Sequence, residues 1–152
     1  MRTLVLAVVL AVAAADPCRA APEPFRPFSV SVTLSPKARD TLVRTGRQVR
    51  VAAMYGFRPP ERLARKLPDG EIVLGRETVA VGPADGTARL VGRGYDAKAV
   101  RPGMPGERRV LINVHTSDGR SDNLLDCGIF EGTLAEAAAR PIGIACKLIG
   151  ED

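Results

Sequence analysis

The chain has 152 residues and a formal net charge of +5, and its aromatic residues are four Phe and two Tyr, with no Trp. This length suits one domain with a single core, which must be built mainly from Val, Ile, Leu and Ala. So few aromatic residues argue against a binding surface made of aromatic anchors. The small charge, without aromatic residues interleaved among the basic ones, argues against a nucleic-acid-binding protein.

Residues 1–20 have the pattern of a secretory signal peptide. A basic start leads into the apolar run 4–15, which is about half as long as the ~20 residues that a membrane-spanning helix needs. Cleavage after Ala20 is favoured over cleavage after Ala15, because Pro17 would stand close behind the second scissile bond. We therefore expect a periplasmic or secreted protein that keeps no membrane span once the signal is removed.

The mature chain is expected to consist of a short arm and one domain. Residues 21–27 carry a proline at every second or third position, which favours an extended tether or a mobile leader. The single domain is expected over 28–152. Its first strand is predicted over 28–34, where apolar residues alternate with Ser and Thr.

A short helix is predicted at 36–43. Ser35 stands where a helix cap would, a proline follows it at the first helical position, and Gly46 marks the end. A second strand is predicted over 48–55 from the alternation of apolar residues, and the Gly- and Pro-containing stretch 56–60 should end it.

Turn signals divide the middle of the chain. The segment 61–67 could form one helical turn or a ragged edge strand. Asp-Gly pairs between apolar runs are typical of hairpin turns, and the chain has three of them, Asp69-Gly70, Asp85-Gly86 and Asp118-Gly119. We therefore expect hairpins at these places.

The last forty or so residues have the densest β-patterning. A strand is predicted over 109–116, with Val110, Ile112 and Val114 toward the core and His115 on the other face. The alternation is expected to resume after the turn, with Leu125, Cys127 and Ile129 facing inward together.

The chain should then form a short helix and a final strand. Thr133 and Glu136 match the capping-box pattern, which predicts a helix over 134–140 that Pro141 stops. A last strand is predicted over 142–148. Altogether, seven or eight short strands with one or two short helices indicate a mainly β domain, an antiparallel β-sandwich or a small barrel.

Cys127 and Cys146 are predicted to form a disulfide. They are the only cysteines left after cleavage at Ala20, both fall in the inward register of their strands, and export would take them to an oxidising compartment. A redox role is not expected, because the chain has no Cys-x-x-Cys sequence.

His115 limits the catalysis that can be expected, because it is the only histidine in the chain. Asp118, Asp122 and Asp126 follow it closely, so a Ca²⁺ site among these three carboxylates stays open as an alternative to an ordinary polar turn. The spacing misses the EF-hand pattern and the ligands for zinc are too few. We expect no metal, no other cofactor and no catalytic residue.

A group of positive charges lies in the middle of the chain. Arg58, Arg62, Arg65 and Lys66 fall within nine residues and could bind an anionic partner, or they could form a solvated charged edge that discourages strand pairing.

The sequence therefore favours a non-catalytic binding module or a structural accessory of the cell envelope, with another envelope or secreted protein as its partner. The alternative is a periplasmic or secreted inhibitor of a hydrolase, with the surface loop 102–106 as the segment that it would present to the enzyme.

Overall fold

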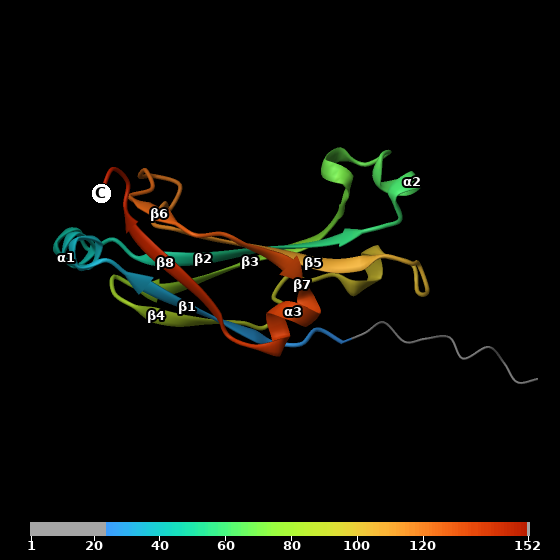
Figure 1. Cartoon of the computed structure of the whole chain (residues 1–152), viewed down its shortest axis with the longest axis horizontal. Coiled ribbons are helices and arrows are strands. Elements are labelled where there is room, and N and C mark those ends of the chain that lie inside the picture. The colour runs from blue at the N-terminus through green and yellow to red at the C-terminus, as the bar shows by residue number, and fades with distance from the viewer. Residues whose placement is uncertain (1–23, 152) are drawn as a thin grey trace, which may run out of the picture.

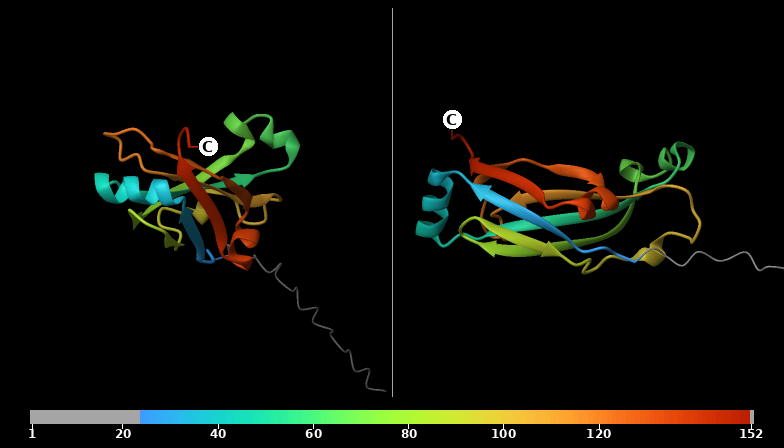
Figure 2. Two further views of the ribbon diagram at one scale, coloured as in Figure 1. Left: turned by 60° about the vertical axis from the view of Figure 1, so that its left-hand side comes forward. Right: turned by 60° about the horizontal axis from the view of Figure 1, so that its bottom comes forward.

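The protein is a β-sandwich of two four-stranded sheets (Figures 1 and 2), as expected from the sequence. The structure is a computed structural model, and it describes residues 24–151. The signal peptide expected at 1–20, with its cleavage sites, lies outside the described residues, as do residues 21–23 of the arm.

The first sheet has the strand order β4-β1-β8-β6. Its strands are β1 (Phe28–Leu34), β4 (Gly86–Leu90), β6 (Leu125–Cys127) and β8 (Ile142–Leu148). Every second residue of β1 is buried, as its apolar alternation predicts, and β8 has the same pattern over most of its length.

The second sheet has the strand order β3-β2-β5-β7. Its strands are β2 (Val49–Arg58), β3 (Ile72–Gly82), β5 (Glu107–His115) and β7 (Phe130–Thr133). β2 continues to Arg58 and does not end at 55 as expected, because a shift of register between Tyr55 and Gly56 lets the strand pass the glycine and stay paired.

One strand pair departs from the predicted antiparallel arrangement. β1 and β8 run parallel, with Val30 opposite Ile142 and Leu34 opposite Cys146, whereas the remaining strand pairs within residues 24–151 are antiparallel. An apolar alternation determines which face of a strand is buried, but it does not determine the direction of the neighbouring strand.

Two of the three predicted Asp-Gly hairpins are wrong. Asp85-Gly86 joins β3 to β4, and Asp118-Gly119 lies between β5 and β6, but the strands of each pair belong to different sheets. These turns therefore take the chain across the sandwich. Asp69-Gly70 lies between β2 and β3, which do pair with each other.

Ile129 does not continue the inward register of Leu125 and Cys127. Its side chain is 67% exposed, because β6 ends at Cys127 and the chain crosses at Gly128 and Ile129 to form β7 in the other sheet. A period-2 pattern cannot show that a strand has been divided between two sheets.

The helices begin where their caps predict. α1 (Pro36–Thr45) has Ser35 as its N-cap and ends at Gly46 in the left-handed conformation. α3 (Leu134–Ala139) has the complete capping box of Thr133 and Glu136. α2 (Glu61–Ala64) is a single turn, and two short 3-10 segments, η1 (Pro68–Gly70) and η2 (Ala97–Ala99), complete the helices of the described chain.

The sandwich has two different ends (Figure 1). At the α1 end lie α1, the carboxyl end of β8 and the turn between β3 and β4. At the opposite end, which we call the arm end, residues 24–27 lead into β1 and the chain enters β5. The core between the sheets consists mainly of Val, Ile, Leu and Ala, as expected.

The predicted disulfide is present. Cys127 and Cys146 are directly opposite each other on the paired strands β6 and β8, with 4.1 Å between their Cα atoms. The bond closes a loop that contains β7 and α3, and it lies toward the α1 end.

We expect the disulfide to stabilise the mature chain by about 3 kcal/mol, because it limits the freedom of the unfolded state. Thiol titration of the chain from Ala21 onward, in denaturant without reductant, should find no free thiol. Urea unfolding should show the loss of stability in a Cys127→Ala/Cys146→Ala variant. Two reactive thiols in the untreated protein would contradict the bond.

We also expect stability to fall in acid. The backbone N–H of Leu34, and then Arg39, hold the pKa of Asp85 below its usual value. The N–H of Leu148 and the Ser35 hydroxyl do the same for Glu151. Both pKa values are lower in the folded state than in the unfolded chain. The two ionised carboxylates therefore stabilise the fold at a pH above the unfolded pKa values of about 4, and this stabilisation is lost as the pH falls below them.

Urea unfolding between pH 7 and pH 2.5 measures this dependence. Asp85→Asn should be less stable than the parent at pH 7 and should show a shallower decline in acid, since the variant has one carboxylate fewer to protonate. An unchanged slope in the variant would contradict this role of Asp85.

Candidate functional site

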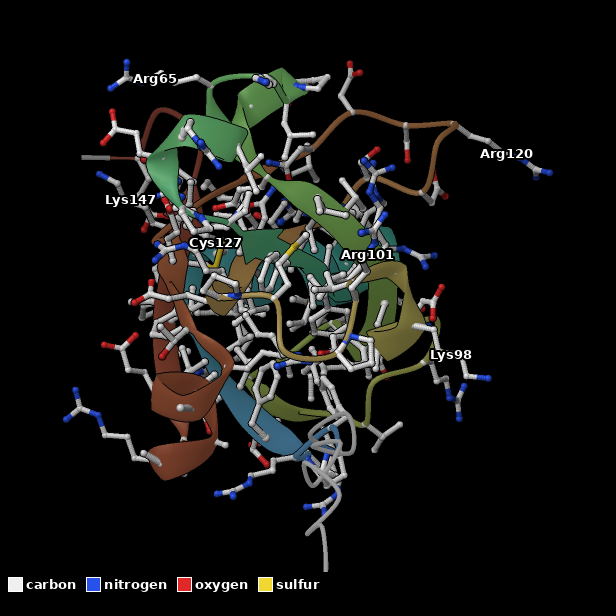
Figure 3. All side chains as sticks on the ribbon, turned by 90° about the vertical axis from the view of Figure 1, so that its right-hand side faces the viewer. Arg65, Lys98, Arg101, Arg120, Cys127 and Lys147 are labelled. Carbon is white, nitrogen blue, oxygen red and sulfur yellow. A yellow bond between two sulfur atoms is a disulfide. The ribbon has the colours of Figure 1, made fainter. Side chains whose placement is uncertain are left out.

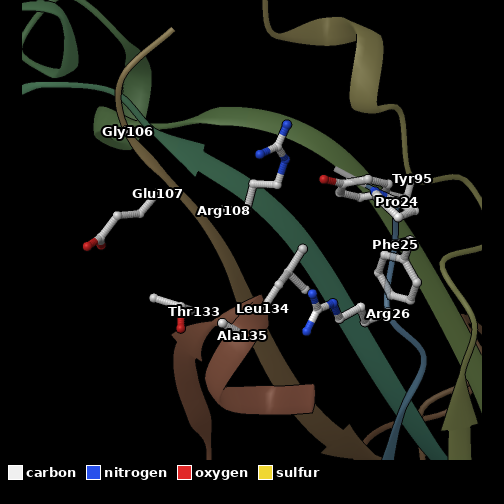
Figure 4. Close-up of a pocket in the computed structure, with 10 residues that line it drawn as sticks. All are labelled: Pro24, Phe25, Arg26, Tyr95, Gly106, Glu107, Arg108, Thr133, Leu134 and Ala135. Carbon is white, nitrogen blue, oxygen red and sulfur yellow. The ribbon is translucent and has the colours of Figure 1, made fainter. Parts of the chain in front are cut away.

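A pocket of about 260 Å³ opens at the arm end of the sandwich, and we call it the end pocket. It lies between the arm, the start of β5 and the start of α3. It is lined by Pro24, Phe25, Arg26, Tyr95, Gly106, Glu107, Arg108, Thr133, Leu134 and Ala135 (Figure 4).

Aromatic rings form one wall of the end pocket. The ring centroid of Phe25 lies 5.2 Å from that of Tyr95 and 5.3 Å from that of Tyr55, and Phe28 lies next to Phe25 at 6.1 Å. Tyr55 and Tyr95 meet edge to face. Four of the six aromatic residues therefore gather here, whereas the composition had argued against aromatic anchors. Composition does not show where residues lie.

The arm is anchored where it enters the fold. Phe25 packs into the aromatic cluster, and a side chain on Gly92 would meet the Phe25 ring at 2.6 Å. Only a glycine lets the backbone at position 92 approach the ring this closely. The described part of the arm, 24–27, is therefore a wall of the pocket and not a free tether.

A buried carboxylate holds the segment 91–95, which carries Tyr95. Glu77 is on the inward face of β3 and is only 5% exposed. Its carboxylate accepts hydrogen bonds from the Tyr55 hydroxyl at 2.7 Å and from the backbone N–H groups of Val91, Gly92 and Arg93 at 3.3, 2.8 and 3.1 Å. These four donors replace the water that the charge loses on burial.

Burial, together with the hydrogen bond to Glu77 and its negative charge, raises the pKa of Tyr55 well above its usual value. The phenol therefore stays protonated and continues to donate to the carboxylate throughout the neutral range. Tyr55 thereby holds in place the Glu77 carboxylate that binds segment 91–93.

Close backbone contact fixes the same segment from the other side. A side chain on Gly75 would overlap the carbonyl oxygen of Gly94, and the N–H of Asp96 donates to the carbonyl of Leu74 at 2.7 Å. Tyr95 is therefore held between two points of attachment on β3, the Glu77 carboxylate and the Leu74 carbonyl.

Arg108 is the cation on the wall opposite the arm. It is in the inward register of β5 together with Val110 and Ile112, and it is paired with the buried Phe57 of β2. Its Nε is buried without a hydrogen-bond partner, and no carboxylate within residues 24–151 forms a salt bridge with it. Figure 4 shows its side chain across the pocket from Phe25 of the arm.

The acidic residues next to Arg108 in the sheet form ion pairs with Arg109. Glu107 and Arg109 alternate with Arg108 along β5 and therefore project from the opposite face of the sheet. Arg109 lies 3.6 Å from Glu107, 3.4 Å from Glu71 and 3.0 Å from Glu131. This network occupies the outer surface of the second sheet and leaves Arg108 on the inner side.

The predicted basic group is not a single free patch. Arg58 lies 3.1 Å from Glu71, and Arg65 lies 2.7 Å from Glu61, so two of the four charges have acidic partners. Arg62 and Lys66 are exposed on and just after α2, and Arg65 projects at the edge of the molecule (Figure 3). This arrangement resembles a solvated charged surface more than an anion site.

The three aspartates of the possible Ca²⁺ site have separate roles. Asp118 accepts hydrogen bonds from Arg120 and Ser121 of its own loop, which lower its pKa. The carbonyl of Asp122 accepts from Arg47, and Asp126 is opposite Lys147 on paired strands. Nowhere in residues 24–151 do three His, Cys, Asp or Glu side chains gather as a metal site would require.

His115 lies on the outer face of β5, as predicted, opposite Arg50 of β2. Its Nδ1 is buried without a hydrogen-bond partner. It does not line the end pocket, and neither do the disulfide or the basic group.

Sequence reasoning missed the residues that shape the end pocket. Arg108 could have been found, because the apolar alternation of Val110, Ile112 and Val114 extends back to it and places a charge in an inward position. Glu77 likewise precedes Val79 and Val81 at alternate positions, which would place its charge in their register. Nothing local to residues 25 or 95 shows that their rings meet.

The structure gives one finding on membrane insertion: among residues 24–151, no helix has the length and apolarity of a membrane span. Comparison with models of known protein families, with curated proteins and with solved structures finds no match. The chain's own side chains are therefore the basis for the function proposed below.

Replacing Glu77 with Gln should lower the free energy of unfolding by about 3 kcal/mol, because the amide cannot accept from all four donors and its own NH₂ group faces N–H groups. Segment 91–95 should also loosen, so trypsin should cleave after Arg93 in the variant. Urea unfolding and limited proteolysis measure the two effects.

Glu61→Gln is the matched control, since it removes an exposed carboxylate from a single helical ion pair. It should change stability by less than about 0.5 kcal/mol. If Glu77→Gln is as stable and as resistant to trypsin as this control, Glu77 does not hold the segment.

Proposed function

We propose that the protein is a non-catalytic binding module that works outside the cytoplasm, in the cell envelope or as a secreted protein, and that its binding site is the end pocket. The disulfide supports this location, because such bonds persist in oxidising compartments. The signal peptide pattern of residues 1–20 supports it independently.

The observation that carries the proposal is the construction of the end pocket. It is a concave site with Phe25, Tyr95, Leu134 and Ala135 along its walls, and its described lining holds two arginines, Arg26 on the arm and Arg108 in the inward register of β5. Largely apolar walls with a few placed polar groups are the usual composition of a small-molecule site. The walls are held in place by Glu77 and by the capping box of α3, so the pocket exists before a ligand arrives.

The chemistry of the lining residues favours binding over catalysis. A nucleophile needs a neighbouring base to activate it, and among residues 24–151 neither His nor Cys lines the end pocket. Its one aliphatic hydroxyl, that of Thr133, donates to the Glu136 carboxylate at 2.9 Å and accepts from the Glu136 N–H at 3.1 Å. The arginines stay protonated and cannot act as bases.

The loop proposed for hydrolase inhibition leads directly into the same site. Residues 102–106 are largely exposed, and Gly106 at the end of the loop lines the end pocket. A protein partner, as the sequence suggested, would therefore meet the loop and the pocket on one surface. The pocket is the better-defined feature, so we place the primary binding function there.

A fragment screen followed by nuclear magnetic resonance tests the proposal. The ¹⁵N-labelled chain from Ala21 onward is titrated with neutral, cationic and anionic fragments, and shifts of the backbone amide signals locate the binding site. We expect the shifts to concentrate at Phe25, Tyr95, Arg108 and Leu134.

Ala135→Trp should fill the end pocket and weaken fragment binding at least about tenfold, because it replaces the space that the ligand would occupy. Ala80→Trp adds the same group to the exposed end of β3 that is paired with Arg50, far from the arm end, and should change nothing. Binding located elsewhere, or equal binding by both variants, would contradict the assignment.

A further inference from the structure

We propose that the ligand of the end pocket is a small organic acid with a single negative charge and an apolar body, and that Arg108 binds its carboxylate. This inference rests on the proposed function and specifies the class of ligand. The residues that carry it are Arg108, Phe25, Tyr95 and Leu134, which come from four separate segments of the chain.

Arg108 determines the charge of the ligand. Its guanidinium emerges from the inward face of β5, where every other described residue of that register is buried and apolar. Its Nε is buried without a partner, and no described carboxylate forms a salt bridge with its guanidinium, so the charge of the side chain is left without a counterion in the described part of the chain. A carboxylate matches the planar fork of a guanidinium and, at the terminal nitrogens of Arg108, would supply both acceptors and the opposite charge.

The acids near Arg108 do not fill this role. Glu107 lines the rim of the end pocket, but its carboxylate lies 3.6 Å from Arg109, and Figure 4 shows it turned away from Arg108. Glu136 is engaged with the N-cap of α3 through the N–H and the hydroxyl of Thr133. The positive charge of Arg108 therefore faces the pocket.

The remaining walls determine the body of the ligand. Phe25 and Tyr95 present aromatic rings, and Leu134 and Ala135 present aliphatic surface, so the part of the ligand away from its carboxylate must be apolar. A volume of 260 Å³ holds about nine water-sized groups. This matches a chain of about eight carbons, or one aromatic ring with a short side chain, together with its carboxylate.

Titration calorimetry tests whether binding depends on a negative charge of the ligand. It compares three molecules of similar shape: octanoate, 1-octanol and octylammonium. Octanoate should bind the chain from Ala21 onward at least about tenfold more tightly than 1-octanol, since charge-assisted hydrogen bonds are stronger than neutral ones. Octylammonium should bind more weakly than both, because its charge would meet that of Arg108.

Substitutions test whether Arg108 is the residue that binds the carboxylate of the ligand. Arg108→Gln should weaken octanoate binding roughly tenfold and leave 1-octanol unchanged. Arg101→Gln is the matched control, because it removes an arginine from the exposed loop next to the pocket and should leave both affinities unchanged. Should Arg108→Gln not fold, the comparison of the three molecules with the parent protein decides the question alone.

The outcomes separate this inference from the proposed function. Octanoate and 1-octanol binding equally at the end pocket would overturn the role of charge but leave the pocket as a binding site. Failure of octanoate to bind overturns the inference, and the fragment screen then shows whether another class of ligand uses the pocket. An equal loss in the Arg101 and Arg108 variants would assign the effect to overall charge and overturn the role of Arg108.

Discussion

The buried carboxylate of Glu77 is the interaction on which the arm end depends. Burying a charge between two sheets costs much free energy unless hydrogen bonds replace the lost water. Here four donors, from Tyr55 and segment 91–93, bind the carboxylate. Because three of these donors are consecutive backbone groups, the carboxylate determines the path of the chain after β4. That path places Tyr95 against Phe25, and the two rings form the wall of the end pocket.

The two ends of the sandwich differ in the contacts that they contain. Toward the α1 end, the disulfide, the capped helix and the carboxylates of Asp85 and Glu151 fasten turns and termini to one another. The arm end has the aromatic cluster, an unpaired cation and an open pocket. The arm end is held as well, by Glu77 and by the capping box of α3, and these contacts support the walls of the pocket that Arg108 faces.

Much of the fold could be predicted from the sequence, because its signals are local. Ser35, Gly46 and the Thr133–Glu136 pair mark the ends of α1 and α3, and alternation locates most strands. The predictions were wrong where pairing between distant segments determines which strands are neighbours. This is the case at Ile129, at the β1–β8 pair and at two of the Asp-Gly turns. The disulfide could be predicted because Cys127 and Cys146 are the cysteines outside the expected signal peptide and both were placed in an inward register. The end pocket could not, because its residues lie far apart in the chain and only the fold brings them together.

Hydrogen exchange of the Gly92 and Arg93 amides measures how firmly Glu77 holds segment 91–95, because both N–H groups donate to its carboxylate. We predict that these amides exchange as slowly as that of Val51 in the central strand β2, and that a bound ligand slows them further. Exchange as fast as that of Gly103 in the exposed loop would show that Glu77 does not fix this segment, and that the wall of the end pocket is not preformed.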